Sequence, residues 1–480
     1  MYRLFISIRE KSFFRPYYPM LYQNCKAAID ILYTSIIRQD LSVGTRIYIT
    51  VKNITIELIG RNFNMTTSMA ASHAVGKMLN DAIFGASGAA GKAAKEFGAD
   101  RVTNATIGAI MDDMGKIACI PTMEKVFRSL PITDIISYAP ISGLPAYLDA
   151  VIDLTFAEQR PDGYCASVAT AGGTGAIHNA IENYSEKGDQ ILTSDWFWGP
   201  YNVLCGEAGR KLATYQLFDE KQNFNIHSFS AKVSELLKMQ QSLLIIINTP
   251  AHNPTGYSLS EEDWTAVLDV CRKQAEGGDK KISILVDIAY IDYAGEKNAT
   301  RKFMKQFGGL PENIFVMFAF SMSKGYTMYG QRTGALIGLS ANKEIITEFA
   351  NVNKYTGRAT WSNINRGAMT VLTQIQQDAG LLKQFEAERE VLYQMIRERG
   401  AIFMEEAKAC GLNALPYKAG FFLSIPAADP NAVCNKLHDD LIFAVPLKKG
   451  VRVAVCAVSS AKMKGMAKKI QTALKFVEGK

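Results

Sequence analysis

The stretch Leu243-Leu244-Ile245-Ile246-Ile247 is a strongly apolar run, and the polar residue Asn248 follows it. A membrane-spanning helix needs about 20 apolar residues, so this run is too short to cross a membrane. Its length and its branched side chains are typical of a strand buried on both faces of a sheet. Similar β-rich runs lie at Ile191–Thr193, Ile282–Val286 and Ile314–Phe318. We expect all four runs to be strands of one sheet.

Amphipathic segments separate these runs and predict helices. The alternation of strands and helices indicates an α/β fold, in which helices cover both faces of a mostly parallel sheet. The expected helices are Ala176–Ser185, Ser230–Met239, Glu261–Ala275 and Arg301–Phe307. Further helical stretches are expected at residues 341–352 and 363–399, before a smaller α+β unit with strands near Gly420–Ser424 and Val451–Val455.

Composition and charge exclude several classes of function. The net charge is +7, but residues 1–64 hold nine Lys or Arg against four Asp or Glu, so they account for most of it. The rest of the chain has no basic excess, and we expect no nucleic-acid partner. The eight cysteines are scattered without a Cys-x-x-Cys pair, and there are five histidines. We therefore expect no metal site, no disulfide framework and a cytoplasmic location.

Residues 1–64 are interpreted as an N-terminal extension that is not part of the mature protein. The composition changes at Met65-Thr66-Thr67-Ser68, which makes Met65 the expected true start. Arg9, Glu10 and Lys11 interrupt any signal-peptide core, whereas an organelle presequence remains an alternative. Residues 46–59 alternate apolar and polar side chains around Lys52-Asn53 and predict a hairpin.

Gly172-Gly173-Thr174-Gly175 follows a strand-like run and opens an expected helix. The free N–H groups of such a helix start bind a phosphate well, although the same residues also fit a simple glycine turn. A dinucleotide fingerprint is disfavoured, because His178 stands where the third glycine should be. A nicotinamide-dependent dehydrogenase is therefore disfavoured too.

Three more motifs follow buried strands. Asn253-Pro254-Thr255-Gly256 is a turn sequence, and Asp287-Ile288-Ala289-Tyr290 ends another strand with an acid. In an open α/β sheet, ligands bind at the carboxyl ends of the strands, although Asp287 could also cap a helix. Ser321-Met322-Ser323-Lys324 follows the strand Ile314–Phe318, and a lysine at this point could equally be a surface residue.

Two arginines complete the set of candidate residues. Arg332 comes eight positions after Lys324, in Gly330-Gln331-Arg332-Thr333-Gly334. Arg452 lies inside the apolar run Val451–Val455, where an unpaired charge would be costly. We expect Arg452 to meet an anion, with a structural salt bridge as the alternative.

In this order, the motifs resemble those of the fold-type I pyridoxal-phosphate enzymes, specifically the aspartate/aromatic aminotransferases. The resemblance runs from about residue 80 to the C-terminus and includes the short spacing from Lys324 to Arg332. It implies a large cofactor-binding domain with a mostly parallel seven-stranded sheet and a smaller α+β domain. The expected parts are an N-terminal arm and part of the small domain at residues 65–115, the large domain at 116–391 and the small C-terminal domain at 392–480.

The resemblance also implies roles around the cofactor, pyridoxal 5'-phosphate. Lys324 would hold it as a Schiff base and then move a proton between the substrate Cα and the cofactor, which ends the half-reaction as pyridoxamine phosphate. Asp287 would keep the pyridine nitrogen protonated, so that the ring accepts electrons. Tyr290 and Asn253 would bond the ring oxygen, and Trp198 would stack on the ring.

The phosphate group would be bound by small side chains, backbone and one guanidinium, which suits a phosphate better than a lysine does. The residues implied are Gly173, Thr174, Ser321, Ser323 and Arg332. Tyr138 matches the family tyrosine that reaches the phosphate of the neighbouring subunit, which implies a homodimer with shared active sites.

Substrate recognition would depend on two further arginines. Arg452 would bind the substrate α-carboxylate, helped by the loop from Asn104 to Gly108. Arg358, in Gly357-Arg358-Ala359-Thr360, matches the partner-subunit arginine that reads a second carboxylate, and a surface arginine is the alternative. An ion entering a dry site needs a counter-charge.

The expected reaction transfers the amino group of aspartate, or a similar dicarboxylic or aromatic amino acid, to 2-oxoglutarate. Two departures from the family pattern, Ile364-Asn365 and Trp196-Phe197, indicate a changed pocket wall that could admit aromatic side chains. The alternatives are an aromatic amino acid or kynurenine aminotransferase, or a lyase of the same fold. A cofactor-binding regulator is disfavoured, because residues 1–64 contain no convincing helix-turn-helix.

Overall fold

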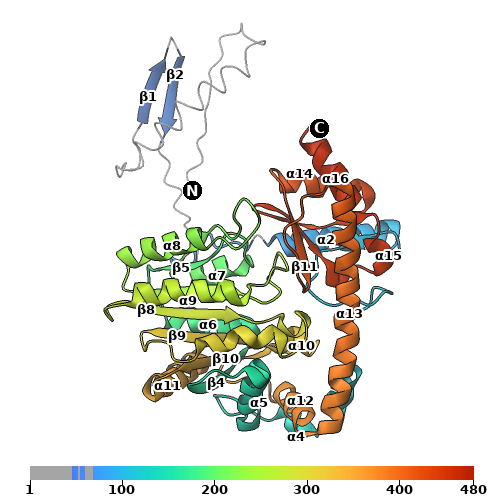
Figure 1. Ribbon diagram of the computed structural model, residues 1–480. Coiled ribbons are helices and arrows are strands. Elements are labelled where there is room, and N and C mark those ends of the chain that lie inside the picture. The colour runs from blue at the N-terminus through green and yellow to red at the C-terminus, as the bar shows by residue number, and fades with distance from the viewer. Residues whose placement is uncertain (1–45, 52–53, 60–68, 80, 480) are drawn as a thin grey trace. The chain divides into compact units, whose positions relative to one another are not determined.

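The computed structural model describes residues 46–51, 54–59, 69–79 and 81–479 (Figure 1). The chain divides into two compact units, residues 1–79 and 80–480. In the first unit, β1 (Arg46–Val51) and β2 (Ile54–Ile59) pair antiparallel, which confirms the expected hairpin strands. The turn at Lys52-Asn53 and the expected start at Met65 lie outside the described residues.

The second unit is built on a seven-stranded sheet. β10 runs antiparallel to both of its neighbours, and the other neighbouring pairs are parallel, which confirms the mostly parallel sheet. Each of the four apolar runs expected from the sequence lies within one of its strands. In spatial order the strands are β4 (Tyr164–Ala171), β10 (Thr333–Ser340), β9 (Ile314–Ser321), β8 (Lys281–Asp287), β7 (Ser242–Asn248), β5 (Gln190–Ser194) and β6 (Lys211–Tyr215).

Helices cover both faces of this sheet (Figure 1). The strand β7 shows why, because its apolar side chains point to alternate faces. Leu243, Ile245 and Ile247 pack into one core, and Leu244 and Ile246 into the other. The first core contains α5 (Pro145–Phe156), α8 (Ile226–Met239) and α9 (Glu261–Ala275), and the second contains α6 (Gly172–Asn183), α7 (Pro200–Glu207) and α11 (Lys343–Thr360).

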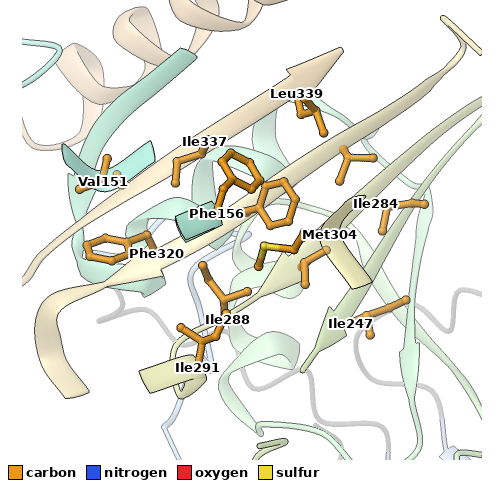
Figure 2. Close-up of a cluster of buried hydrophobic side chains, with 14 of the residues drawn as sticks. Val151, Phe156, Ile247, Ile284, Ile288, Ile291, Met304, Phe320, Ile337 and Leu339 are labelled. Carbon is orange, nitrogen blue, oxygen red and sulfur yellow. The ribbon is translucent and has the colours of Figure 1, made fainter. Parts of the chain in front are cut away.

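Figure 2 shows part of the first core, where Phe156 and Ile337 lie near Met304. Met304 belongs to η3 (Ala299–Phe307), so the helix expected at residues 301–307 is a 3₁₀ helix. Three residues per turn bring positions three apart onto one side. Arg301, Met304 and Phe307 are all buried, which fits that spacing.

The second unit also contains a smaller α+β part, called the small unit below. It packs around a separate core, made mainly of side chains from the C-terminal part of the chain. The long helix α13 (Ala379–Cys410) belongs to both cores, because Phe385 packs in the first and Phe403 in the second. The expected boundary between residues 391 and 392 therefore falls inside this helix. The unit contains β11 (Phe422–Pro426), β14 (Gly450–Ala454) and β13 (Val445–Leu447), which pair antiparallel, and β3 (Thr103–Asn104) with β12 (Ile442–Phe443), which pair parallel.

Shorter elements complete the second unit. The helices are α2 (Ala82–Phe97), α3 (Pro121–Ser129), α4 (Ile132–Ile136), α10 (Met322–Gly325), α12 (Arg366–Gln377), α14 (Pro430–Leu437), α15 (Ser460–Met463) and α16 (Met466–Val477). The 3₁₀ turns are η1 (Ala157–Gln159), η2 (Ile291–Tyr293), η4 (His438–Asp440) and η5 (Val455–Ala457). Among the described residues, no helix combines the length and the hydropathy that crossing a membrane requires.

Candidate functional site

The candidate residues meet at one edge of the sheet because of the strand directions. β4, β5, β7, β8 and β9 are parallel, so their carboxyl ends lie at the same edge. β10 runs the opposite way, so its first residue, Thr333, lies at that edge too, directly after Arg332. Gly173, Trp198, Asn253, Asp287 and Lys324 each follow or end one of the parallel strands.

Lys324 lies in the short helix α10, directly after β9. Its Nζ donates a hydrogen bond of 2.8 Å to the carbonyl oxygen of Gly108, and it lies 4.9 Å from the ring centre of Tyr329. Burial lowers the pKa of Lys324 to about 8, and the positive charges of Arg332 and Arg452 act in the same direction. The amine is therefore available in its neutral form near pH 8, as proton transfer requires.

Asp287 is the last residue of β8 and is 5% exposed. The hydroxyl of Tyr201 donates to its Oδ2 over 2.7 Å, and the N–H of Ala289 donates to its Oδ1 over 3.2 Å. Burial raises the pKa of Asp287, and these two hydrogen bonds and Lys324 offset part of that rise. The carboxylate is thus held by neutral donors, which leaves it able to pair with a cation.

A polar network joins Tyr290, Asn253 and Arg452. The amide Nδ2 of Asn253 donates to the hydroxyl of Tyr290 over 3.2 Å, and its Oδ1 accepts from Nη1 of Arg452 over 3.3 Å. The backbone N–H of Asn253 donates to Oδ1 of Asn248, which fixes this side of the loop after β7. Burial raises the pKa of Tyr290, so its hydroxyl remains a neutral donor.

Arg452 is 2% exposed, although it is a cation. Its Nη2 donates to the carbonyl oxygen of Thr106 over 2.8 Å, its Nε has no partner, and its guanidinium lies 4.2 Å over the ring of Phe422. It forms no ion pair within the residues that the structure describes, so the salt-bridge alternative is wrong there. A buried cation of this kind is suited to an incoming carboxylate.

The residues expected to hold a phosphate lie together in the structure. Nη1 of Arg332 donates to the hydroxyl of Ser323 over 3.0 Å, and the N–H of Ser323 donates to Oγ of Ser321 over 3.2 Å. A Cβ added at Gly172 would lie 2.6 Å from Nη2 of Arg332, and one at Gly173 would lie 3.2 Å from Ser321. Gly172 also has a φ of +69°, a backbone conformation that favours glycine, where the chain turns beside the guanidinium.

The first turn of α6 faces the same group. Thr174 lies in that turn and is partly buried, and no side chain caps the helix start. Uncapped N–H groups at a helix start attract an anion. Trp198 lies at the entrance to α7, with its ring perpendicular to that of Tyr201 at 5.6 Å.

Two expected residues do not join this group within one chain. Tyr138 is 87% exposed in the segment between α4 and α5. Arg358 is exposed in the last turn of α11, where it bonds the hydroxyl of Ser362. Both residues had been expected to act in a neighbouring subunit, which remains a prediction.

Sequence reasoning missed Tyr201 and Tyr329. Tyr201 lies three residues after Trp198, and its burial could have been suspected from that helical spacing. Tyr329 lies between Lys324 and Arg332, and its hydroxyl accepts a hydrogen bond of 2.9 Å from the N–H of Ile110. No feature of the sequence around Tyr329 links it to residue 110.

These residues fit the pyridoxal phosphate that the resemblance implies. Arg452 is a buried cation with an orphaned Nε, Asp287 is a buried acid held by neutral donors, and the glycines of α6 leave room beside Arg332. The described residues contain no group of three or more His, Cys, Asp or Glu side chains that could hold a metal ion.

Comparison with known proteins agrees with this geometry. Residues 100–470 match the family model described as aminotransferase class I and II, a family that depends on pyridoxal phosphate. The chain is 30% identical to the aromatic-amino-acid aminotransferase of Pseudomonas aeruginosa over 227 residues, which is 47% of this chain and 53% of that enzyme. It is 26% identical to the cytoplasmic aspartate aminotransferase of Dictyostelium discoideum over 295 residues, 58% of this chain and 63% of that enzyme. The chain thus matches less than two thirds of these two relatives' length.

Solved structures cover more of the chain. An aminotransferase from Anaerococcus prevotii has a TM-score of 0.83 and 37% identity, over 85% of this chain and 99% of that one. An aromatic-amino-acid aminotransferase from Burkholderia pseudomallei, covalently bound to pyridoxal phosphate, has a TM-score of 0.70 and 22% identity, over 85% of this chain and 100% of that one. These likenesses show the fold-type I architecture.

Proposed function

Because the chain belongs to the class I and II aminotransferase family, we propose that it transfers the amino group of an amino acid to 2-oxoglutarate, with pyridoxal phosphate bound at Lys324. One observation carries the proposal, namely the grouping of three ionisable side chains at one sheet edge. They are a lysine whose pKa burial lowers to about 8, a buried aspartate, and a buried arginine that forms no ion pair within the described part of the chain.

Lys324 would move the proton. When bound, pyridoxal phosphate supplies the electron sink that makes the substrate Cα–H acidic. The neutral amine of Lys324 would take that proton from Cα and deliver it to the cofactor carbon, and with the oxo-acid acceptor it would carry a proton in the reverse direction. The carbonyl oxygen of Gly108 orients the amine, and the buried surroundings keep its pKa near the working pH.

Asp287 and Tyr290 would set the charge on the cofactor. The carboxylate of Asp287 would pair with a protonated ring nitrogen, and the hydroxyl of Tyr201 holds that carboxylate in place. Tyr290 and Asn253, which bond each other, would donate to the ring oxygen. Gly173, Thr174, Ser321, Ser323 and Arg332 would hold the phosphate, and Trp198 would stack on the ring.

Arg452 would bind the α-carboxylate of the substrate. A two-pronged bond between guanidinium and carboxylate fixes the orientation of the amino acid. Asn253 accepts a hydrogen bond from Nη1 of Arg452, and the carbonyl oxygen of Thr106 accepts one from Nη2. The substrate therefore meets a guanidinium that is already positioned. This pre-positioning aligns the Cα–H bond with Lys324.

A homodimer with shared active sites would complete the site with Tyr138 and Arg358 from the partner. The exposed apolar side chains of α4 support this proposal, because Ile132 and Ile136 are 65% and 71% exposed beside Tyr138. Apolar side chains grouped on a surface in this way are typical of a protein interface.

The amino donor is proposed to be aspartate or a similar dicarboxylic amino acid. The second candidate is an aromatic donor, which the apolar surroundings of Lys324 favour. The rings of Tyr329, Tyr290 and Phe421 lie 4.9, 5.9 and 5.9 Å from its Nζ.

A steady-state comparison of donors tests the function. We expect purified protein with added pyridoxal phosphate to transfer the amino group of aspartate, tyrosine, kynurenine or alanine to 2-oxoglutarate, and to differ between these donors. Borohydride should fix the cofactor mass on the peptide that contains Lys324. Protein that gains no mass there and forms no glutamate would contradict the proposal.

Replacing Arg358 by alanine tests the diacid preference. We expect kcat/KM for aspartate to fall about 10- to 100-fold, because a charged hydrogen bond to the second carboxylate is lost. The value for alanine as donor should stay within about twofold. Lys354→Ala removes a cation from the exposed face of the same helix and serves as the control. Equal losses for both donors in the Arg358 variant would remove the diacid argument.

A further inference from the structure

Asp292 is a buried acid that the proposed reaction does not use. It lies in η2, two residues after Tyr290, and its side chain is 14% exposed. Its Oδ1 lies 3.1 Å from Nη2 of Arg301, and its Oδ2 lies 3.5 Å from Nη1 of Arg389. Both arginine side chains are also nearly buried, at 3% and 11% exposure. One acid therefore lies between two buried cations.

The same carboxylate lies against the helix that contains Lys324. A Cβ added at Gly325, the next residue, would lie 2.3 Å from Oδ2 of Asp292. The glycine is therefore required for the acid to approach the backbone of α10 this closely. The neighbouring Tyr293 also contacts this helix, because its hydroxyl donates to the carbonyl oxygen of Lys324 over 3.3 Å.

The two arginines attach Asp292 to rigid elements. Nε of Arg301 donates to the carbonyl oxygens of Leu154 and Thr155 in the last turn of α5. Arg389 belongs to α13, where its guanidinium lies 5.3 Å over the ring of Phe385. The segment before Asp292 is fixed in the core, since Ile291 packs among the side chains shown in Figure 2.

A second contact links α10 to α13. The ring of Tyr326, two residues after Lys324, stacks on Phe385 at 4.6 Å. Gln376 donates to the hydroxyl of Tyr326 over 3.0 Å. The backbone that follows the lysine is therefore held between the Asp292 carboxylate and a helix that spans both cores.

We propose that Asp292 is a positioning residue for Lys324, acting through Gly325 and held in place by Arg301 and Arg389. This inference rests on the proposed function of Lys324. The ion cluster fixes the backbone from which the amine extends, so that Nζ lies where the substrate proton is transferred. Reacting groups must be placed to within a fraction of an ångström for efficient transfer.

The charge of the cluster supports a carboxylate at this position. Burial alone would raise the pKa of Asp292, but Arg389 and Arg301 outweigh burial and hold it below its usual value. Asparagine would keep the shape but remove the carboxylate that forms ion pairs with both arginines. The Glu182–Arg210 pair is a matched control, because Arg210 is equally buried and lies at the opposite edge of the sheet, directly before β6, where it bonds Ser185.

The first experiment compares Asp292→Asn with Glu182→Gln. We expect Asp292→Asn to lower kcat about 10- to 100-fold with KM within about twofold. Borohydride fixation of pyridoxal phosphate on Lys324 of the apoprotein should also slow by about tenfold. Glu182→Gln should lower the melting temperature while kcat and fixation stay near wild type. Equal kcat losses in the two variants, per folded molecule, would overturn the inference.

Two further variants separate positioning from stability. Gly325→Ala should reproduce the kinetic loss, and its effect should not add to that of Asp292→Asn, because both disturb one contact. Adding Arg389→Met to Asp292→Asn removes one unpaired cation, so the melting temperature should recover while kcat remains low. Recovery of kcat together with the melting temperature would show that Asp292 acts through stability alone and would overturn the inference.

The same measurements separate this inference from the proposed function. Wild-type protein that gains no cofactor mass at Lys324 would contradict both. The positioning role alone would be contradicted by a different result. In that result wild-type protein gains the mass, and the Asp292→Asn variant gains it equally fast and turns over equally well.

Discussion

Replacing Lys324 by alanine is expected to lower turnover by up to about 10⁴-fold, the upper range for loss of a positioned acid–base group. The reason is that Nζ is held by the carbonyl oxygen of Gly108 in a site whose other nearby amines and guanidines cannot take its place. Arg332 and Arg452 remain protonated at working pH, because a guanidinium does not titrate there. The measurement is kcat for amino transfer, with the cofactor mass on the peptide followed in parallel.

Two variants control this result. Lys324→Arg keeps the positive charge but cannot present a neutral base, so we expect it to be as inactive as Lys324→Ala. Lys418→Ala removes an exposed amine that bonds the carbonyl oxygen of Ser258 outside the site, and should leave kcat near wild type. An Arg variant that keeps more than about a tenth of the activity would contradict the proton-transfer role.

The strands of the sheet were predictable where they are uniformly apolar. The run Ile314–Phe318 lies within β9, in which every residue is buried. The neighbouring strand β10 gave no comparable pattern, because glycines interrupt it. A Cβ at Gly334 would lie 2.5 Å from the carbonyl oxygen of Phe320, and one at Gly338 would lie 2.9 Å from Phe349. Close packing thus requires the residues that weaken the strand pattern.

Helix boundaries depended on side-chain bonds that apolar spacing does not reveal. The helical stretch expected at residues 363–399 is two helices, α12 and α13, which meet at Asp378. The carboxylate of Asp378 accepts from the N–H groups of Gly380 and Leu381, so it caps the second helix. An aspartate before a small residue is a recognisable helix cap. The apolar spacing continues across Asp378, so it predicted one helix instead of two.

The candidate site was predictable to the extent that each motif follows a strand. Asp287 ends β8 and Lys324 follows the neighbouring parallel strand β9, so a single rule about strand ends brings them together. The partners of these residues were not predictable, because they come from distant parts of the chain. The Lys324 amine bonds a carbonyl 216 residues away, and the Asp287 carboxylate bonds a tyrosine 86 residues away. Such pairs follow from the packing of α7 and the small unit against the sheet edge.

Replacing Asp287 by asparagine is expected to lower kcat about 10²- to 10³-fold, the usual cost of removing one electrostatic contact to developing charge. Asparagine keeps the size and the hydrogen bond from Tyr201 but has no charge to hold a proton on the ring nitrogen. Borohydride should still fix the cofactor at Lys324, because the phosphate residues and the amine are unchanged. Near-normal turnover in this variant would remove Asp287 from the mechanism.

Tyr201→Phe weakens the charge of Asp287 without removing its carboxyl group. The phenol donates to the Asp287 carboxylate over 2.7 Å, and burial already raises the pKa of this acid. Losing the donor disfavours the ionised form, so the pKa of Asp287 should rise further. The acidic limb of the kcat profile should then move to higher pH, while activity well above the limb stays within about tenfold of wild type. A limb that does not move, together with a large loss at every pH, would mean that Tyr201 supports α7 rather than the charge of Asp287.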